Sequence, residues 1–196
     1  MNNFNFVAPF YDSLVSLVFG QQIEKASDFF LGDIKGQKVL VFGGGTGKIL
    51  EALDKSNEVT YIEKSAKMID IAQRRSMGNV SFLNQDALLF SSSDDFDVVV
   101  CPFFLDCFND KNLDSLITSI KRIMAYNGKL IVSDFQRTNS NGLLIWIMHL
   151  FFRVFSGLES KKLVNIHSRI VKKGLILENE EFFHKNMIFS RVYGNL

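Results

Sequence analysis

The sequence predicts an α/β fold in which a mostly parallel sheet carries helices on both faces. Short β-rich runs alternate with helix-sized segments through the middle of the chain, which is typical of right-handed βαβ units. The run Phe96–Cys101 (FDVVVC) is almost continuously apolar, as expected for a central strand covered on both faces. The 196 residues, 47% of them hydrophobic, are enough to bury one core.

The regular middle of the chain predicts five strands and three connecting helices. The strands are short apolar or β-branched runs at Lys38–Phe42, Glu58–Ile62, Val80–Asn84, Phe96–Cys101 and Lys129–Ser133. The helices have apolar residues on one face and lie at Thr46–Asp54, Ser65–Arg75 and Asn112–Met124. The turn Asn127-Gly128 follows the last helix and leads into the fifth strand.

The two ends of the chain depart from this alternation. Residues 4–31 predict one or two helices, and residues 141–173 an apolar helix followed by a more polar one at Glu159–Lys173. Beyond Gly174, two short alternating runs predict an antiparallel pair of strands at the sheet edge. The paired runs are Leu175–Glu178 and Met187–Tyr193, with Glu180–His184 between them. We expect a single domain over residues 1–196.

Composition excludes several classes of protein. The net charge is only +1, without the basic stripe typical of nucleic-acid binders. Cys101 and Cys107 fit neither a disulfide framework nor a zinc site, so we expect no metal. The apolar run 143–155 (LLIWIMHLFFRVF) is shorter than the ~20 residues of a spanning helix. We expect a cytoplasmic protein without a transmembrane segment or nucleic-acid partner, and the sequence carries no signal for an oligomeric state.

The stretch VLVFGGGTGK, residues 39–48, ends the first strand in a glycine-rich loop. Such a loop lets the backbone come close to a ligand, with N–H groups facing it. The spacing excludes a Walker loop, because Ile49 stands where a magnesium-binding hydroxyl is needed. It also departs from the dinucleotide pattern, whose third glycine would fall at Lys48. The pattern present is G-x-G-x-G, at Gly43, Gly45 and Gly47; a plain tight turn remains the alternative.

Acidic residues follow the next two strands. Glu63 ends the second strand, where a carboxylate can accept two hydrogen bonds from a ribose diol, and Asp86 follows the third, where it can receive an adenine amine. Each alone could be a solvated strand-end or turn residue. Together with the glycine loop they mark the carboxyl ends of three successive parallel strands, which is where open α/β sheets bind ligands.

On these motifs the chain resembles the class I S-adenosylmethionine-dependent methyltransferases from about Val39 to Val192. The similar stretches are VLVFGGGTG, YIEKSAKMIDIAQRR, FLNQDALLF, FDVVVCPFFLD and NGKLIVSDF. The resemblance implies a Rossmann-like, doubly wound, seven-stranded sheet with an antiparallel C-terminal hairpin. It also implies four parts: a helical lid over 1–31, a cofactor-binding core over 38–133, a helical cap on the acceptor side over 135–173 and the hairpin over 174–196.

The resemblance further implies S-adenosyl-L-methionine as cofactor. The residues expected to contact it are Tyr11, Phe42, Gly43, Gly44, Gly45, Thr46, Gly47, Glu63, Lys64, Met68, Asp86, Ala87 and Cys101. Tyr11 is included because of a second, narrower resemblance. The opening VAPFYDSLVSLVFG resembles the N-terminal helix of quinone-biosynthesis and small-lipid methyltransferases. There an aromatic-acidic pair, here Tyr11-Asp12, belongs to a lid near the cofactor.

Two departures from the family pattern carry information. The family often has an acid two residues before its first motif glycine, supporting the loop that binds the methionine amino group; this chain has Val41. Backbone carbonyls of the glycine loop could serve instead. After the fourth strand, Cys101-Pro102-Phe103-Phe104 lacks the [DN]-P-P-[YF] pattern of enzymes that methylate adenine or glutamine amines, which disfavours a flipped-base substrate. Cys101 also precedes Pro102 instead of following it, so a packed thiol is favoured over a nucleophile.

We expect a small apolar or aromatic acceptor. The helix at 143–155, if it covers the pocket, offers an apolar wall and allows transient contact with a membrane surface; a plain core helix is the alternative. Phe103, Phe104 and Phe108 would form the opposite wall. A general base would add about 10²–10⁴-fold for a phenol or enol. No catalytic residue can be assigned, and the candidates are His149, Asp106, Tyr11 and His184. Asp106 reads equally well as a solvated or helix-capping residue.

Two other functions fit the same residues. One is a non-catalytic S-adenosylmethionine-binding or Rossmann-like scaffold protein, made more credible by Val41. The other is nicotinamide-dependent oxidoreduction, which the glycine spacing opposes.

Overall fold

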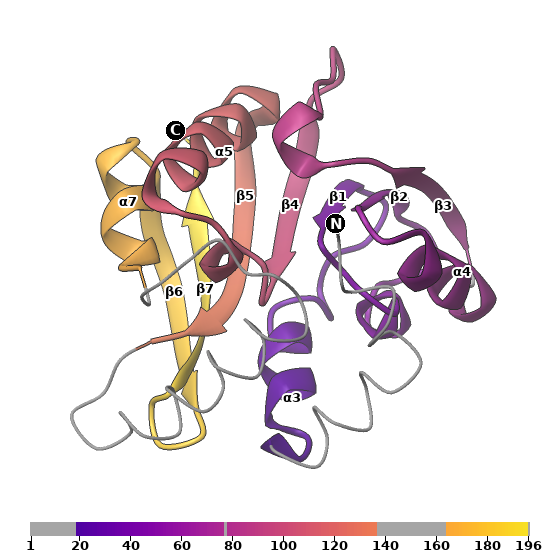
Figure 1. Ribbon diagram of the computed structural model, residues 1–196, viewed down its shortest axis with the longest axis horizontal. Helices are drawn as coiled ribbons and strands as arrows, with labels where there is room; N and C mark the ends of the chain where they lie inside the picture. The colour runs from indigo at the N-terminus through magenta and orange to yellow at the C-terminus, as the bar shows by residue number, and fades with distance from the viewer. Residues whose placement is uncertain (1–18, 77, 137–163, 196) are drawn as a thin grey trace.

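Seven strands form one sheet in the computed structural model, which describes residues 19–76, 78–136 and 164–195. Their order across the sheet is β3-β2-β1-β4-β5-β7-β6 (Figure 1). The strands are β1 (Lys38–Phe42), β2 (Glu58–Glu63), β3 (Asn79–Asn84), β4 (Phe96–Pro102), β5 (Met124–Phe135), β6 (Ile176–Phe183) and β7 (Ile188–Gly194). The first five are mutually parallel, and β7 runs antiparallel to both β5 and β6. The predicted doubly wound sheet with a C-terminal antiparallel hairpin is confirmed.

Helices cover both faces of this sheet. The α-helices of the described residues are α3 (Gln22–Asp28), α4 (Ala66–Arg75), α5 (Asp110–Ile123) and α7 (Ile166–Lys172). The short 3₁₀ helices are η2 (Lys48–Glu51), η3 (Ala87–Leu89) and η4 (Leu105–Cys107). Figure 1 shows α5 and α7 on one face, and α3 beyond the arrowheads of β4 and β5. No described helix is long and apolar enough to cross a membrane.

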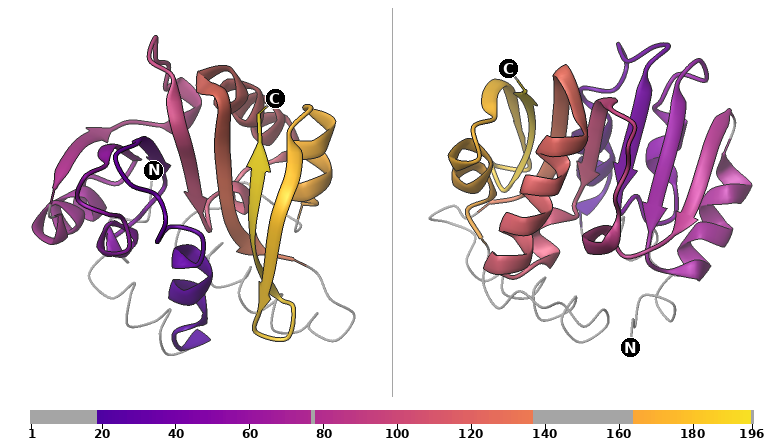
Figure 2. Two further views of the ribbon diagram at one scale, coloured as in Figure 1. Left: turned by 180° about the vertical axis from the view of Figure 1, so that it is seen from behind. Right: turned by 90° about the horizontal axis from the view of Figure 1, so that it is seen from above.

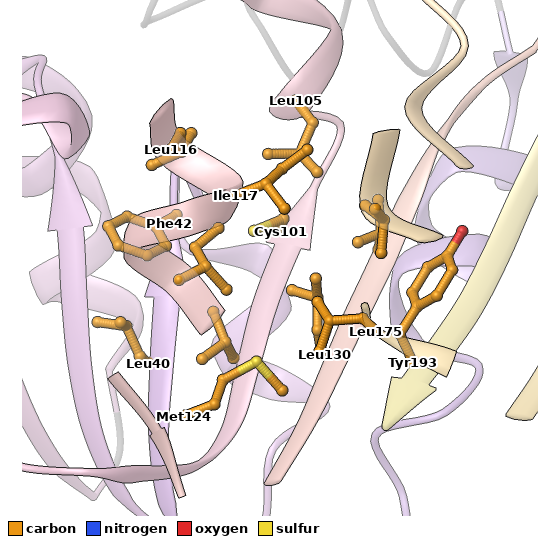
Figure 3. Close-up of a cluster of buried hydrophobic side chains, with 14 of the residues drawn as sticks. Leu40, Phe42, Cys101, Leu105, Leu116, Ile117, Met124, Leu130, Leu175 and Tyr193 are labelled. Atoms are coloured by element: carbon orange, nitrogen blue, oxygen red, sulfur yellow. The ribbon is translucent and has the colours of Figure 1, made fainter. Parts of the chain in front are cut away.

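Side-chain alternation along β1 divides the core into two layers. Leu40 and Phe42 point to the layer under α5 and α7, whereas Val39 and Val41 point to the layer under η2 and α4. This is the period-two geometry of a strand buried on both faces. In Figure 3 the first layer appears as a cluster of hydrophobic side chains from the sheet packed against α5.

Helix α5 follows from a cap and an apolar stripe. The Asn109 side chain accepts a hydrogen bond from the N–H of Asn112 at 3.0 Å and so starts the helix. The stripe repeats at helical spacing and is buried: Leu113, Leu116, Ile117, Ile120 and Ile123. The helix begins two residues before the predicted one and stops at Ile123, because Met124 already belongs to β5.

Helix α3 is anchored across the carboxyl ends of the strands. The Ser133 hydroxyl on β5 donates a hydrogen bond to the carbonyl of Ala26 at 2.8 Å. Lys48 of η2 pairs with Glu24, and the Phe29 ring meets the Phe183 ring of the hairpin edge-on at 5.5 Å. Figure 2 shows this hairpin and α3 from behind. These contacts fix α3 opposite the glycine loop.

Two predicted segments are wrong. The helix expected at Thr46–Asp54 is only the single 3₁₀ turn η2, because Gly47 has a left-handed φ of 81° and so holds the chain out of a helix until residue 48. The segment Glu180–His184 was expected between the two strands, but β6 continues through Phe183 and the turn lies at 184–186. Its exposed acidic residues sit on an edge strand, where polar side chains protect the open hydrogen-bonding edge.

Candidate active site

The glycine loop turns the chain sharply at the end of β1. Gly43, Gly45 and Gly47 have φ values of 65°, 61° and 81°, a region that side chains other than glycine rarely adopt. The N–H of Gly43 still donates to the carbonyl of Ile62 on β2 at 2.9 Å, and the Tyr61 hydroxyl donates to the carbonyl of Gly45 at 3.0 Å. The loop is therefore held in shape by its neighbour strand.

Glu63 joins the glycine loop to the loop after β2. One carboxylate oxygen accepts the N–H of Gly45 at 3.3 Å, and the other accepts the N–H of Ser65 at 2.8 Å. Burial raises the pKa of Glu63, while these backbone hydrogen bonds oppose the rise. The backbone N–H of Lys64 is a third donor to this carboxylate, so about one of its roughly four lone-pair positions remains.

Asp86 stands after β3, next to Lys64 from the loop after β2. Lys64 Nζ lies 2.6 Å from Asp86 Oδ2, and Asp86 Oδ1 accepts the N–H of Leu88 at 3.0 Å, which caps η3. Burial works against ionisation of Asp86, but the Lys64 hydrogen bond and charge and the Leu88 N–H together lower its pKa. The Asn84 side-chain amide also donates to the carbonyls of Glu63 and Lys64, both at 3.0 Å. Asp86 therefore stays ionised, and its turn is fixed to the turn after β2.

Other predicted contact residues belong to the packed interior. Phe42, Met68 and Cys101 are fully buried, and the Phe42 ring stacks parallel on Phe104 with centroids 6.1 Å apart. Ala87 is also buried. Burial raises the pKa of the Cys101 thiol far above its usual range, as expected of a packed thiol and not of a nucleophile. Figure 3 shows Cys101 inside the cluster beneath α5.

A cleft of about 260 Å³ lies between the glycine loop and α3. The loop contributes the consecutive residues 43–46, and Pro102 and Phe103 contribute the end of β4. The α3 side contributes Ile23, Glu24, Ser27 and Asp28, and the η2 region Lys48, Ile49, Glu51 and Ala52. The lining therefore combines polar backbone and carboxylates with apolar side chains. Sequence reasoning did not single out the α3 side chains.

Phe103, which lines the cleft, belongs to an aromatic cluster. The Phe103 ring lies 4.9 Å from that of Phe135, which in turn lies 5.4 Å from Phe19. Phe103 adopts a left-handed φ of 49°, costly for an aromatic residue, and its N–H donates to the carbonyl of Ser133 at 2.7 Å. The sequence predicted Phe103, Phe104 and Phe108 as one wall. The structure brings Phe104 and Phe108 together edge-on at 5.0 Å, but turns Phe104 onto the glycine loop and Phe103 into the cleft.

The candidate base Asp106 lies beside a second carboxyl group, that of Asp134. The N–H of Asp106 donates to Asp134 Oδ2 at 3.2 Å, and the N–H of Phe135 donates to Asp134 Oδ1 at 2.8 Å. Asp134 is fully buried, and burial together with the charge of Asp106 raises its pKa well above the usual value. Burial likewise raises the pKa of Asp106 to about 6. Asp106 does not cap α5, because Asn109 does.

Asp134 was missed in the sequence although a signal existed. It ends the strand motif KLIVSDF in the same way that Glu63 ends β2, at the edge where ligand-binding residues gather. The remaining candidate bases are placed as follows. His184 lies in the turn after β6, with its ring edge-on to Phe19 at 6.1 Å. Tyr11, His149 and the segment 143–155 lie outside the described residues.

Residues 39–128 match the profile of a methyltransferase domain family, and this span runs from β1 through the glycine loop, Glu63 and Asp86 to the start of β5. This part of the chain is similar to a methyltransferase domain. A curated relative of this domain, the ubiquinone/menaquinone biosynthesis C-methyltransferase UbiE of Pseudomonas aeruginosa, is 29% identical over 151 residues. The match covers 70% of this chain and 58% of the relative. The chain therefore spans less than two thirds of the length of that relative.

Solved methyltransferase structures share the fold of this domain. A complex of the Haloferax volcanii Trm112 methyltransferase activator with a methyltransferase gives a TM-score of 0.79 at 13% identity, covering 100% of this chain and 98% of the other. The N-methyltransferase NodS of Bradyrhizobium japonicum, in complex with S-adenosyl-L-homocysteine, gives 0.68 at 17% identity, covering 89% and 84%. At such identities the likeness shows the fold. Within the described residues, no group of His, Cys, Asp and Glu side chains is arranged to hold a metal ion.

Proposed function

We propose that this protein transfers the methyl group of S-adenosyl-L-methionine to a small apolar or aromatic acceptor. One observation carries this proposal: the carboxyl ends of β1, β2 and β3 form a single hydrogen-bonded rim. Glu63 links to Gly45 on one side, and its carbonyl accepts from Asn84 on the other, beside the Lys64–Asp86 pair. Nucleotide-type ligands bind at this rim in open α/β sheets.

The residues of the rim fit such a cofactor. A Cβ at position 45 would meet no other heavy atom within 4 Å, so the loop is open toward the cleft at Gly45. Glu63 has about one acceptor position to spare for a ribose hydroxyl. The ionised carboxylate of Asp86 suits an exocyclic amine. When bound, S-adenosylmethionine supplies a methyl group already activated by a sulfonium.

The chain's own residues would then align the acceptor and exclude water. Proximity and orientation can lower a barrier by about 7–11 kcal/mol without a base. Phe103 and Ile23 line the cleft with apolar surface, and the aromatic cluster of Phe19 and Phe135 backs Phe103. Such walls favour an apolar acceptor, and similarity to a protein named as a ubiquinone/menaquinone biosynthesis methyltransferase supports a quinone-like ring. The protein would act on this small molecule in the cytoplasm.

Of the two candidate bases within the described residues, Asp106 and His184, Asp106 is the one beside a second carboxyl group. Asp106 lies in η4, three residues after the cleft residue Phe103, and a pKa of about 6 leaves it ionised at neutral pH. It would accept the proton of a phenol or enol acceptor as the carbon or oxygen nucleophile attacks. Asp134 would position it through the bond from the Asp106 N–H.

Calorimetry with S-adenosylhomocysteine on the Glu63→Ala protein tests the cofactor site. We expect a loss of affinity of about tenfold or more, because the variant removes both the ribose acceptor and the support of Gly45. Glu58→Ala at the opposite, exposed end of the same strand is the control and should bind as the unaltered protein does. Equal affinities for all three proteins, or no binding by the unaltered protein, would refute the assignment.

An acceptor screen tests the second half of the proposal. Methyl transfer from labelled S-adenosylmethionine should favour a prenylated quinol over small hydrophilic amines, because only the former buries apolar area against Phe103 and Ile23. Equal turnover of both classes would contradict an apolar acceptor pocket.

A further inference from the structure

The cleft between α3 and the glycine loop carries an excess of negative charge. Its lining includes the carboxylates of Glu24, Asp28 and Glu51 and the single ammonium of Lys48. Lys48 pairs with Glu24, so the charges of Asp28 and Glu51 are left without a cation from the lining. Such a cleft attracts a cationic group.

Asp28 is the carboxylate of this set best placed for a ligand. It lies in the last turn of α3, is partly buried, and its side chain has no hydrogen bond or ion pair with any other described residue. The helix itself cannot swing away freely, because Ser133 holds the Ala26 carbonyl at 2.8 Å. A partly desolvated acid held against a polar loop gains by meeting a cation.

The first strand offers no acid for the same task. Val41 stands at the position where the family resemblance predicts an acid. Its side chain is fully buried and packs in the layer under η2 and α4. The loop glycines and Asp28 line one cavity, so an amino acid lying along the loop would bring its ammonium within reach of α3.

We propose that Asp28 binds the primary ammonium of the cofactor's amino-acid end, replacing from α3 the acid that β1 lacks. This role rests on the proposed cofactor binding. Glu51 supplies a second negative charge on the η2 side, while Lys48 stays engaged with Glu24. The amino-acid end is thereby recognised by a helix that precedes the sheet in sequence.

Two ligands that differ only in the amino group test this role. S-adenosylhomocysteine and an analogue with hydrogen in place of the amino group are titrated calorimetrically into the unaltered protein, Asp28→Asn and the control Asp33→Asn, whose side chain is exposed. We expect Asp28→Asn to weaken S-adenosylhomocysteine by about tenfold or more and to leave the analogue's affinity unchanged. Binding of the analogue also reports that the variant is folded.

The pH dependence of affinity gives a second readout. Burial, with the nearby charges of Glu24 and Glu51, raises the pKa of Asp28 to about 6, against the lowering effect of Lys48. Affinity of the unaltered protein for S-adenosylhomocysteine should therefore fall as the pH drops below about 6, and this fall should be smaller in Asp28→Asn.

The outcomes separate this inference from the proposed function. If the unaltered protein binds and Glu63→Ala weakens binding, but Asp28→Asn affects both ligands equally or neither, the role of Asp28 is overturned and cofactor binding stands. If the unaltered protein binds neither ligand, both proposals are overturned.

Discussion

Single residues at the ends of strands decide what this rim can bind, and their roles depend on partners that lie far apart in sequence. The proposed role of Glu63 as a ligand for a sugar depends on Gly45 and Ser65, which orient its two oxygens. The pKa of Asp86 is lowered by Lys64, 2.6 Å away, together with the N–H of Leu88. Both oxygens of Asp134, in contrast, accept backbone N–H groups, and the nearby charge of Asp106 raises its pKa. Carboxylates therefore have three different environments along one edge of the sheet.

Gly47 is the loop residue whose replacement should be most disruptive to stability. An added Cβ would lie 2.6 Å from the Cβ of Ala72 and 2.7 Å from its Cα, and φ is +81°. We expect Gly47→Ala to lower the free energy of unfolding by about 2–4 kcal/mol, from backbone strain and overpacking against α4. Urea denaturation measures this loss.

Gly32→Ala is the matched control for that change. Gly32 has no positive φ, and an added Cβ there would meet nothing within 4 Å. Its effect should stay below about 1 kcal/mol in either direction. Equal destabilisation by the two substitutions would mean that close packing of the loop on α4 is not what Gly47 provides.

Elements were predictable where side-chain periodicity and burial agree. β1 has the predicted bounds, and α4 differs only in that Ser65 caps the helix instead of starting it. Ser65 accepts the N–H of Met68 at 3.3 Å, as a capping serine does. The parallel order of the first five strands followed from the helix-sized segments between them.

Elements were mispredicted where tertiary geometry overrides local pattern. The loop after Gly47 has apolar residues at helical spacing, Ile49, Leu50 and Leu53, and all three are buried against the sheet. The structure buries them with the single 3₁₀ turn η2 in place of the predicted helix. β6 runs on through Glu180 because Arg191 on β7 pairs with that carboxylate at 3.1 Å and lies over the Phe182 ring. Neither cross-strand contact is visible from the sequence of the strand alone.

The candidate site was predictable to the extent that it lies on strand ends. Glycine spacing, Glu63 and Asp86 could be placed because every parallel strand of an open sheet delivers its carboxyl end to one edge. Asp28 could not, since nothing local to QIEKASD says that α3 crosses that edge; the Ser133 bond and the Phe29–Phe183 contact decide it. The division into lid, core, cap and hairpin stays a prediction.

For the whole molecule, the buried carboxyl pair makes stability depend on pH. Asp106 and Asp134 both have a pKa above the ordinary value of 3.8, Asp106 at about 6. The folded state therefore holds more protons than the unfolded state between about pH 4 and 6, and in that range stability falls as the pH rises. The stabilisation from protonation is complete below the unfolded pKa and is lost as the pH passes the folded pKa.

Asp134→Asn should cancel much of this fall, because a carboxamide is uncharged at every pH, as the protonated carboxyl is. Relative to the unaltered protein, the variant should gain about 1–3 kcal/mol in free energy of unfolding between about pH 5 and pH 8. Denaturation of both proteins at several pH values measures this difference directly. Burial lowers the pKa of His167, which gives an opposing pH dependence, but this contribution is the same in both proteins and cancels in the difference. Asp95→Asn, at an exposed position, should track the unaltered protein throughout. If the curve of Asp134→Asn also runs parallel to that of the unaltered protein, ionisation of Asp134 does not cost stability, and its raised pKa is contradicted.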